Sequence, residues 1–170
     1  MGDQFTHIVQ PVARLIDRAR KSGARIVWIR SVRDVDAPEF VYFGREPYLI
    51  RDGWGVEFVP PLTVHQGETV IEKHSHDCFA RTGLDDYLRD NGIDAPEFSV
   101  TVVGVALHVC VDAAVVGFSV RDYQVVLPID CVAPYEGPAA SGTLWRYALP
   151  AYSYNITVTR SEQITFHPVD

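Results

Sequence analysis

The fold is decided by a nearly continuous apolar run, VTVVGV, at residues 100–105. Runs of this kind are typical of strands that are buried on both faces, as in a parallel sheet covered by helices. A helix is expected directly after the run, over residues 109–116, with Gly117 as its end. Ligands of such sheets bind beyond the carboxyl ends of the strands, so Cys110 falls where a site is expected.

Helices and strands alternate on either side of this run. Residues 10–22 place four apolar side chains on one helical face, at Val12, Leu15, Ile16 and Ala19. Residues 25–30 form a short β-branched run that predicts a strand. Further strands are expected over 68–73, 123–129 and 155–159, and further helices over 82–91 and near Trp145. The alternation predicts an α/β fold with an open, mostly parallel sheet and helices on both faces, in a Rossmann-like three-layer α/β/α arrangement.

Residues 31–67 interrupt this alternation. Prolines and glycines break any periodicity, and the segment is too rich in aromatic residues to be a solvated linker. A long loop of this kind in a compact domain usually carries function. We interpret it as an excursion on the substrate side of the fold, the alternative being a loop that only packs against the body.

Length and charge limit the classes of protein to which the chain can belong. Its 170 residues predict a single domain over 1–170, and 47% hydrophobic and 22% charged residues are ordinary globular usage. The formal net charge of −7 argues against binding to nucleic acid and against attachment to an anionic membrane through a basic patch. We therefore expect a small-molecule substrate, with neither nucleic acid nor membrane as a partner.

Signals for a cellular compartment are few. No stretch approaches the ~18 apolar residues that a membrane span needs, and the first residues lack the basic and apolar regions of a signal peptide. Three cysteines, Cys78, Cys110 and Cys131, are too few and odd in number for a disulfide framework. The expected location is the cytoplasm, where a lone cysteine is either a buried apolar residue or a working thiolate.

Cys110 and Lys73 are the two residues that favour chemistry, and each has two interpretations. Cys110 lies at or near the start of the helix after the buried strand, where the helix dipole favours a thiolate, or it is a small apolar residue in a helix rich in Ala and Val. Lys73 ends the 68–73 strand and is either a surface lysine or, if it shares a cleft with Cys110, a cation that stabilises the thiolate. Cys78 lies beyond that strand and is interpreted as structural.

Two further groups of polar residues have alternative interpretations. Residues 74–78 read HSHDC, and a His-x-His pair on a strand can direct both rings toward a metal ion. No second pair at ligand spacing accompanies it, so neither a metal nor another cofactor is expected. Asp130 ends the strand after the Cys110 helix and is either catalytic or the cap of the following turn.

Three stretches together resemble the isochorismatase-like family of cysteine hydrolases. The segment before the family's lysine strand is matched by WGVEFVP at 54–60. Its lysine motif, in which a Phe, a Thr and a Leu follow the lysine, is matched by VIEKHSHDCFARTGL at 70–84. Its nucleophile motif, G-x-A-x-x-x-C-V, is matched by VGVALHVCV at 103–111. The resemblance runs from the first helix to about Ala133, and the order and joint spacing of the motifs make it specific.

The resemblance implies a six-stranded parallel sheet, assembly into a homodimer or homotetramer, and an Asp-Lys-Cys triad that acts on C–N bonds. By this analogy Cys110 is the nucleophile and Lys73 the cationic member of the triad. The backbone N–H groups of Ala106 and Cys110 would form the oxyanion hole, with a cis peptide between Val105 and Ala106. The substrate pocket would be lined by Trp54, Phe79, Val105 and Leu107.

The family's first strand, which ends in the triad Asp, has no clear counterpart in this sequence. Asp3-Gln4-Phe5 echoes the family pattern of an Asp close before a Gln and a Phe, but no apolar strand precedes Asp3 and the first helix follows within a few residues. Either Asp3 is the general base, or the echo is accidental. In the second case the chain is a truncated product or another element fills the place of the missing strand.

The expected function is thiol-dependent hydrolysis of a small amide or N-carbamoyl substrate through a thioester acyl-enzyme. Nicotinamide is not expected as the substrate, because residues 30–36 lack the Asp-x-His and further histidines of the family members that hydrolyse it. The alternatives are a non-catalytic homologue that binds a small carboxylate or amide, and ether hydrolysis of the isochorismate type.

Overall fold

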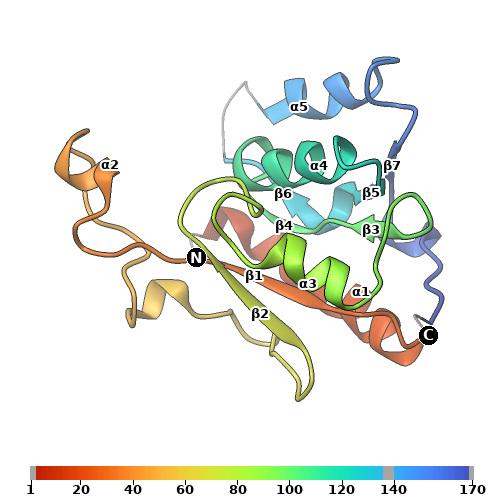
Figure 1. Cartoon of the computed structure of the whole chain (residues 1–170), viewed down its shortest axis with the longest axis horizontal. Coiled ribbons are helices and arrows are strands. Elements are labelled where there is room, and N and C mark those ends of the chain that lie inside the picture. The colour runs from red at the N-terminus through yellow and green to blue at the C-terminus, as the bar shows by residue number, and fades with distance from the viewer. Residues whose placement is uncertain (1–2, 136–139, 169–170) are drawn as a thin grey trace.

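Parallel strands and the helices that cover them make up the protein, which confirms the α/β class (Figure 1). The computed structural model describes residues 3–135 and 140–168, apart from the side chains of residues 3, 140 and 141. The parallel pairs are β1 (Val27–Ser31) with β2 (Thr69–Lys73), β5 (Gln124–Pro128) with both β3 (Ser99–Thr101) and β7 (Ile156–Thr159), and β4 (Gly104–Val105) with β6 (Val132–Ala133).

The strands fall into three separate parallel groups in the part of the chain that the structure describes. The single six-stranded sheet that the family resemblance implies is therefore not formed. A cavity of about 1450 Å³ has Val27 and Ile29 of β1 and Val100 and Thr101 of β3 in its wall, so it adjoins both the β1–β2 pair and the three-stranded group. The strands nevertheless run parallel within each group, as the sequence predicts.

Two hydrophobic clusters lie on the two faces of β5. Val125 and Leu127 belong to the first cluster, together with buried residues of α3 (Leu84–Asp90), α4 (Asp112–Ser119) and α5 (Ala140–Tyr147). The intervening Val126 packs against the second cluster, to which α1 (Val9–Lys21) contributes Val12 and Leu15. The alternation follows from the period of two along a strand. In Figure 1, α4 and α5 accordingly lie on one side of the strands and α1 on the other.

Residues 3–8, directly before α1, are helical. A 3-10 helix, η1, covers Asp3–Ile8 and continues into α1, and its Phe5 and Ile8 are buried in the second cluster. The predicted helix at 10–22 is confirmed as α1, whose buried face is the one expected from the apolar spacing. The echo Asp3-Gln4-Phe5 thus lies in a helical turn and not at the end of a strand.

The apolar run at 100–105 does not form one strand. β3 ends at Thr101 and pairs with β5, whereas β4 begins at Gly104 and pairs with β6, a strand that the pattern did not predict. Gly104 has a φ of +118°, a backbone conformation that side chains disfavour. The chain therefore changes partner strand within the run, just before it reaches Cys110.

The helix after this run also differs from the predicted one. A π-helical turn, Leu107–Val111, precedes α4, and α4 continues past Gly117 to Ser119. The expected end at Gly117 is wrong because this glycine serves close packing: a Cβ placed there would lie 2.9 Å from the ring of Phe79.

Residues 34–49 form an arm that projects from the body and contains the short helix α2 (Pro38–Val41; Figure 1). A β-bridge between Arg33 and Ile50 closes the base of the arm. At its far end Tyr42 and Phe43 are each 79% exposed. The arm is followed by a 3-10 helix, η2 (Trp54–Val56), which returns the chain toward the body.

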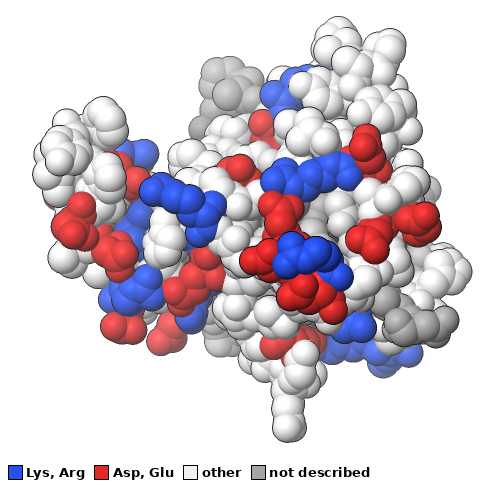
Figure 2. All heavy atoms as spheres, viewed as in Figure 1, with Lys and Arg blue, Asp and Glu red and all other residues white. Residues whose placement is uncertain are grey.

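Charges of both signs are intermixed on the face of the molecule that Figure 2 draws. Ion pairs of the protein include Arg51 with Glu72 at 2.8 Å and Arg121 with Asp85 at 2.9 Å. Within residues 3–135 and 140–168, no helix has the length and apolar character needed to cross a membrane.

Candidate active site

Lys73, the last residue of β2, lies next to the thiol of Cys110. The Nζ atom is 3.3 Å from Sγ, and Lys73 is only 4% exposed, which excludes the surface-lysine alternative. Nζ also donates to the carbonyl oxygens of Ser75 and His76, at 2.6 and 3.2 Å. An ammonium has three N–H donors, and these three acceptors can use all of them. The buried charge is therefore satisfied and one N–H is directed at the sulfur.

Cys110 lies in the π-helical turn Leu107–Val111, two residues before α4 begins at Asp112, which agrees with its predicted place at or near the start of a helix. The carbonyl oxygen of Ala106 holds the turn by accepting the N–H groups of Val109 and Val111, at 3.1 and 3.2 Å. Single π-helical turns occur frequently at functional sites. Cys110 is partly exposed, so its sulfur can meet a ligand.

The peptide bond between Val105 and Ala106 is cis, as the family resemblance implies. Ala106 directly precedes the π-helical turn and Cys110 lies within it. The role of their two N–H groups as an oxyanion hole stays a prediction.

The other two cysteines differ from Cys110 in their surroundings. Cys78 is 2% exposed and Cys131 is 0% exposed. Burial raises the pKa of each thiol to about 11, so both stay protonated at neutral pH. The structural interpretation of Cys78 is consistent with this environment, and Cys110 is the accessible thiol of the three.

His76 is the functional candidate that the sequence reasoning missed. Its Nδ1 atom lies 3.6 Å from Sγ of Cys110. Partial burial and the positive charges of Lys73 and Arg33 lower the pKa of His76 below its usual value of about 6.5. The imidazole is therefore neutral at neutral pH. The His-x-His spacing was the available signal, but it was interpreted only as a possible metal pair.

The two rings of that His-x-His pair have different contacts. Nδ1 of His74 lies 3.1 Å from the carbonyl oxygen of Val32, whereas His76 faces Cys110. Among the described residues no group of three or more His, Cys, Asp or Glu side chains is arranged to hold a metal ion.

The thiol opens onto the cavity of about 1450 Å³, whose wall includes Lys73, His76 and Cys110. Of the four residues predicted to line the substrate pocket, Trp54 and Val105 lie in this wall. Phe79 and Leu107 belong instead to the first hydrophobic cluster, at 6% and 2% exposed. These two are buried because apolar rings and helices surround them, as when Phe79 meets Phe118 edge to face at 4.8 Å between ring centroids.

The base of the arm contributes charged groups to the same cavity. Arg33 is 3% exposed, donates through Nε to Glu39 and through Nη1 to the carbonyl oxygen of Val32 at 3.1 Å. The hydroxyl of Tyr48 donates to Glu39 at 3.0 Å, and the guanidinium of Arg45 lies 5.1 Å from the centre of the Tyr48 ring. Arg33, Arg45 and Tyr48 all line the cavity, so the arm reaches the site as the interpretation of residues 31–67 expects.

The two predicted carboxylates have different outcomes. Asp3 begins η1, and its side chain lies outside the described part of the chain, so its role as the general base stays a prediction. Asp130 accepts the backbone N–H and the hydroxyl of Ser161, at 2.8 and 2.5 Å. The contacts are structural, but they join Asp130 to the start of the 3-10 helix Ser161–Gln163 and not to the turn directly after its own strand, which was the predicted alternative.

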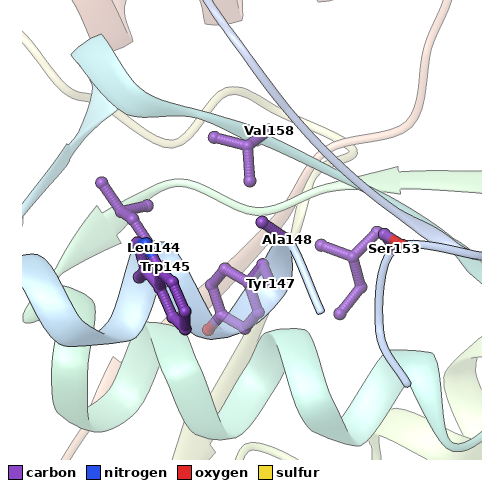
Figure 3. Close-up of a pocket in the computed structure, with 7 residues that line it drawn as sticks. Leu144, Trp145, Tyr147, Ala148, Ser153 and Val158 are labelled. Carbon is purple, nitrogen blue, oxygen red and sulfur yellow. The ribbon is translucent and has the colours of Figure 1, made fainter. Parts of the chain in front are cut away.

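A second, smaller hollow lies between α5 and β7 (Figure 3). It has a volume of about 500 Å³ and is lined mainly by apolar side chains, among them Leu144, Tyr147 and Val158. It contains neither Lys73 nor Cys110, so the larger cavity is the candidate site.

A match to a known protein family covers nearly the whole chain. The model of the isochorismatase domain matches residues 2–163. The chain belongs to the isochorismatase family. Membership places the cavity, Lys73 and Cys110 within a domain that covers nearly the whole chain.

Relatives of this isochorismatase-family chain include several hydrolases. It is 34% identical over 131 residues to streptothricin hydrolase of Streptomyces noursei. The aligned region covers 75% of this chain and 45% of that protein. It is 27% identical over 154 residues to ureidoacrylate amidohydrolase RutB of Methylorubrum extorquens. Here the aligned region covers 78% of this chain and 59% of that protein. The chain therefore spans about half the length of the curated relatives it matches.

Among solved structures, N-carbamoylsarcosine amidase from Thermoplasma acidophilum superposes with a TM-score of 0.80 at 28% identity, over 98% of this chain and 89% of that one. The isochorismatase-like fold is thus found over almost the full length of both chains.

Proposed function

We propose that this isochorismatase-family chain is a cysteine-dependent hydrolase that cleaves the C–N bond of a small amide or N-carbamoyl substrate. The observation that carries the proposal is the 3.3 Å contact between Nζ of Lys73 and Sγ of Cys110, at the wall of a cavity with room for a small ligand. A buried ammonium beside an accessible thiol favours the thiolate, which is the nucleophilic form of cysteine. The names of the three relatives, two hydrolases and an amidase, support the same reaction class.

In the proposed reaction Sγ of Cys110 bonds to the carbonyl carbon, and the C–N bond then breaks to leave a thioester. The developing oxyanion is held by the N–H groups of Ala106 and Cys110, the family's oxyanion hole. Water hydrolyses the thioester and restores the thiol. The family resemblance assigns the proton transfers of both steps to a carboxylate, for which Asp3 is the candidate.

Ammonia release from a panel of small amides and N-carbamoyl amino acids tests the proposal. We expect Cys110→Ala to abolish the release, because the reaction has no other accessible nucleophilic sulfur. Cys78→Ala is the matched control, since that thiol is buried in the core and its pKa is raised. Circular dichroism verifies that both variants fold. Turnover by Cys110→Ala equal to that of the unmodified protein would contradict the proposal.

A further inference from the structure

A chain of contacts leads from the buried side chain of Arg33 to the guanidinium of Arg45. Arg33 donates through Nε to the carboxylate of Glu39. That carboxylate also accepts the hydroxyl of Tyr48 at 3.0 Å, and the guanidinium of Arg45 lies over the Tyr48 ring. The backbone N–H of Arg45 donates to the carbonyl oxygen of Glu39 at 3.1 Å. Both the backbone and the side chain of Arg45 are therefore positioned by groups that Arg33 anchors to the body.

The guanidinium of Arg45 has donors to spare, unlike that of Arg33. Within residues 3–135 and 140–168, the Arg45 side chain makes neither a hydrogen bond nor an ion pair, and its contact is the face of the Tyr48 ring. A guanidinium carries five N–H donors in a planar fork that fits a carboxylate. Stacking on a ring uses the face of that plane and leaves the donors at its edge available.

This guanidinium lies within electrostatic reach of the reacting sulfur. Arg45, Tyr48 and Cys110 line the same cavity of about 1450 Å³. His76, whose Nδ1 atom lies 3.6 Å from the sulfur, has a pKa that the positive charge of Arg45 helps to lower. A ligand in this cavity can therefore meet the sulfur and the guanidinium at the same time.

We propose that Arg45 binds a carboxylate of the substrate, so that the substrate is a small amide or N-carbamoyl compound that also carries a free carboxylate. The inference rests on the proposed function, and it leaves the reaction and its proton transfers as described there. Arg45 determines specificity in this proposal and takes no part in the bond-breaking steps.

The charges near the sulfur suit a ligand of this kind. Those that act on the ring of His76 include Lys73, Arg33, Arg45 and Glu39. Arg33 and Glu39 pair with each other, and Lys73 donates to the sulfur and two carbonyl oxygens. A thiolate repels an approaching carboxylate, and the remaining cation, Arg45, offsets that repulsion. One ammonium thus serves the thiolate, and one guanidinium is left for the ligand.

Two pairs of compounds that share a reacting group and differ in a carboxylate test the subsite. Ammonia release is measured from succinamate and butyramide, and from N-carbamoylglycine and propylurea. We expect Arg45→Met to lower kcat/KM for the two carboxylates by about 10–100-fold, mainly through KM, because charge-assisted hydrogen bonds are lost. The two neutral compounds should be hydrolysed as before, and Arg45→Lys should fall between Arg45→Met and the unmodified protein.

Arg89→Met is the matched control, because it removes an exposed arginine of α3 that is not part of the cavity wall. It should leave all four rates unchanged. An equal loss for charged and neutral compounds in Arg45→Met, or no loss for the carboxylates, would overturn the proposal.

A second test needs no turnover. Cys110 is alkylated with iodoacetate, which carries a carboxylate, and with iodoacetamide, its neutral counterpart. We expect the ratio of the iodoacetate rate to the iodoacetamide rate to fall about threefold or more in Arg45→Met, because one attracting charge is lost. An unchanged ratio would overturn the subsite, even where both pairs of compounds are hydrolysed and the proposed function stands. If the ratio falls but no amide is hydrolysed, the proposed function fails while the carboxylate subsite stands.

Discussion

Lys73 and Cys110 meet at 3.3 Å between Nζ and Sγ although they follow strands of different parallel groups. Lys73 ends β2, which pairs with β1, and Cys110 follows β4, which pairs with β6. The β1–β2 pair thus carries the ammonium of this contact, and the segment after β4 carries the sulfur. The distance between ammonium and sulfur is therefore set by how the groups pack around the shared cavity.

Replacement of Lys73 by methionine should make the Cys110 thiolate harder to form. A unit charge at about 4 Å contributes roughly 1–4 kcal/mol at effective dielectrics of ~80 to ~20, which corresponds to about one to three pH units. We expect the midpoint of the pH profile of Cys110 alkylation by iodoacetamide to rise by that amount in Lys73→Met. Lys21→Met, at the exposed end of α1, should leave the profile in place. An unchanged profile in Lys73→Met would show that the ammonium does not act on the thiol.

Alkylation of the folded protein should stop at one cysteine. Cys78 and Cys131 are buried, and burial raises the pKa of each to about 11, so neither presents a thiolate near pH 8. We expect peptide mapping after a short exposure to iodoacetamide to find the label on Cys110 alone. After denaturation in urea all three cysteines should react. Equal labelling of Cys78 and Cys110 in the native protein would contradict the assignment of Cys110 as the accessible thiol.

Gly117→Ala should destabilise the fold even though alanine favours helices. The added Cβ would lie 2.9 Å from the ring of Phe79, and overpacking of this kind typically costs about 1–3 kcal/mol. Gly142→Ala in α5 is the matched control, because nothing lies within 4 Å of a Cβ there. The control should gain roughly 0.5–1 kcal/mol from the lost flexibility of glycine. Urea unfolding measures both, and a stabilised Gly117→Ala would contradict the close packing.

The free energy of unfolding should decrease in acid, partly because Glu68 becomes protonated. Hydrogen bonds from Arg20, and then from the N–H of His65 and the indole of Trp28, lower the pKa of Glu68 to about 2 against burial. A lowered carboxyl pKa stabilises the fold above pH 4.5, and this contribution is lost as the pH falls toward 2.

Glu68→Gln should therefore reduce the free energy of unfolding at pH 6 by on the order of 1–2 kcal/mol, allowing for solvent screening. Near pH 2 the variant and the unmodified protein should converge. Glu162→Gln, whose side chain is 75% exposed, is the control and should change little at either pH. Parallel curves for Glu68→Gln and the unmodified protein from pH 6 to pH 2 would rule out this linkage.

The sequence predicts those elements whose pattern is local. The apolar face of α1 at Val12, Leu15 and Ala19 is buried as its spacing requires. Gly117 was predicted to end a helix because glycine does so by propensity, but packing against Phe79 decides its role. Such contacts join residues far apart in the chain, so no window of sequence contains them.

The candidate site also has parts that local motifs predict and parts that depend on contacts between distant residues. The motifs predict that Lys73 and Cys110 belong together, and the structure brings their side chains into contact. The place of His76 depends on how the loop after β2 is anchored to Lys73, which spacing alone does not express. Phe79 and Leu107 were predicted in the pocket from their closeness to these motifs, whereas the fold turns both into the core.

The bridge between Arg33 and Ile50 makes the arm a self-contained insertion. Arg33 donates its N–H to Leu49 at 2.8 Å, and Arg51 donates to Arg33 at 3.0 Å, so the chain leaves and re-enters the body at one place. The cost of closing such a loop grows only slowly with its length. An arm of different length or composition can thus be exchanged above this closure while β2 and its lysine keep their register. Such an exchange would change the part of the cavity wall that Arg45 and Tyr48 form and leave the pairing of β2 with β1 unchanged.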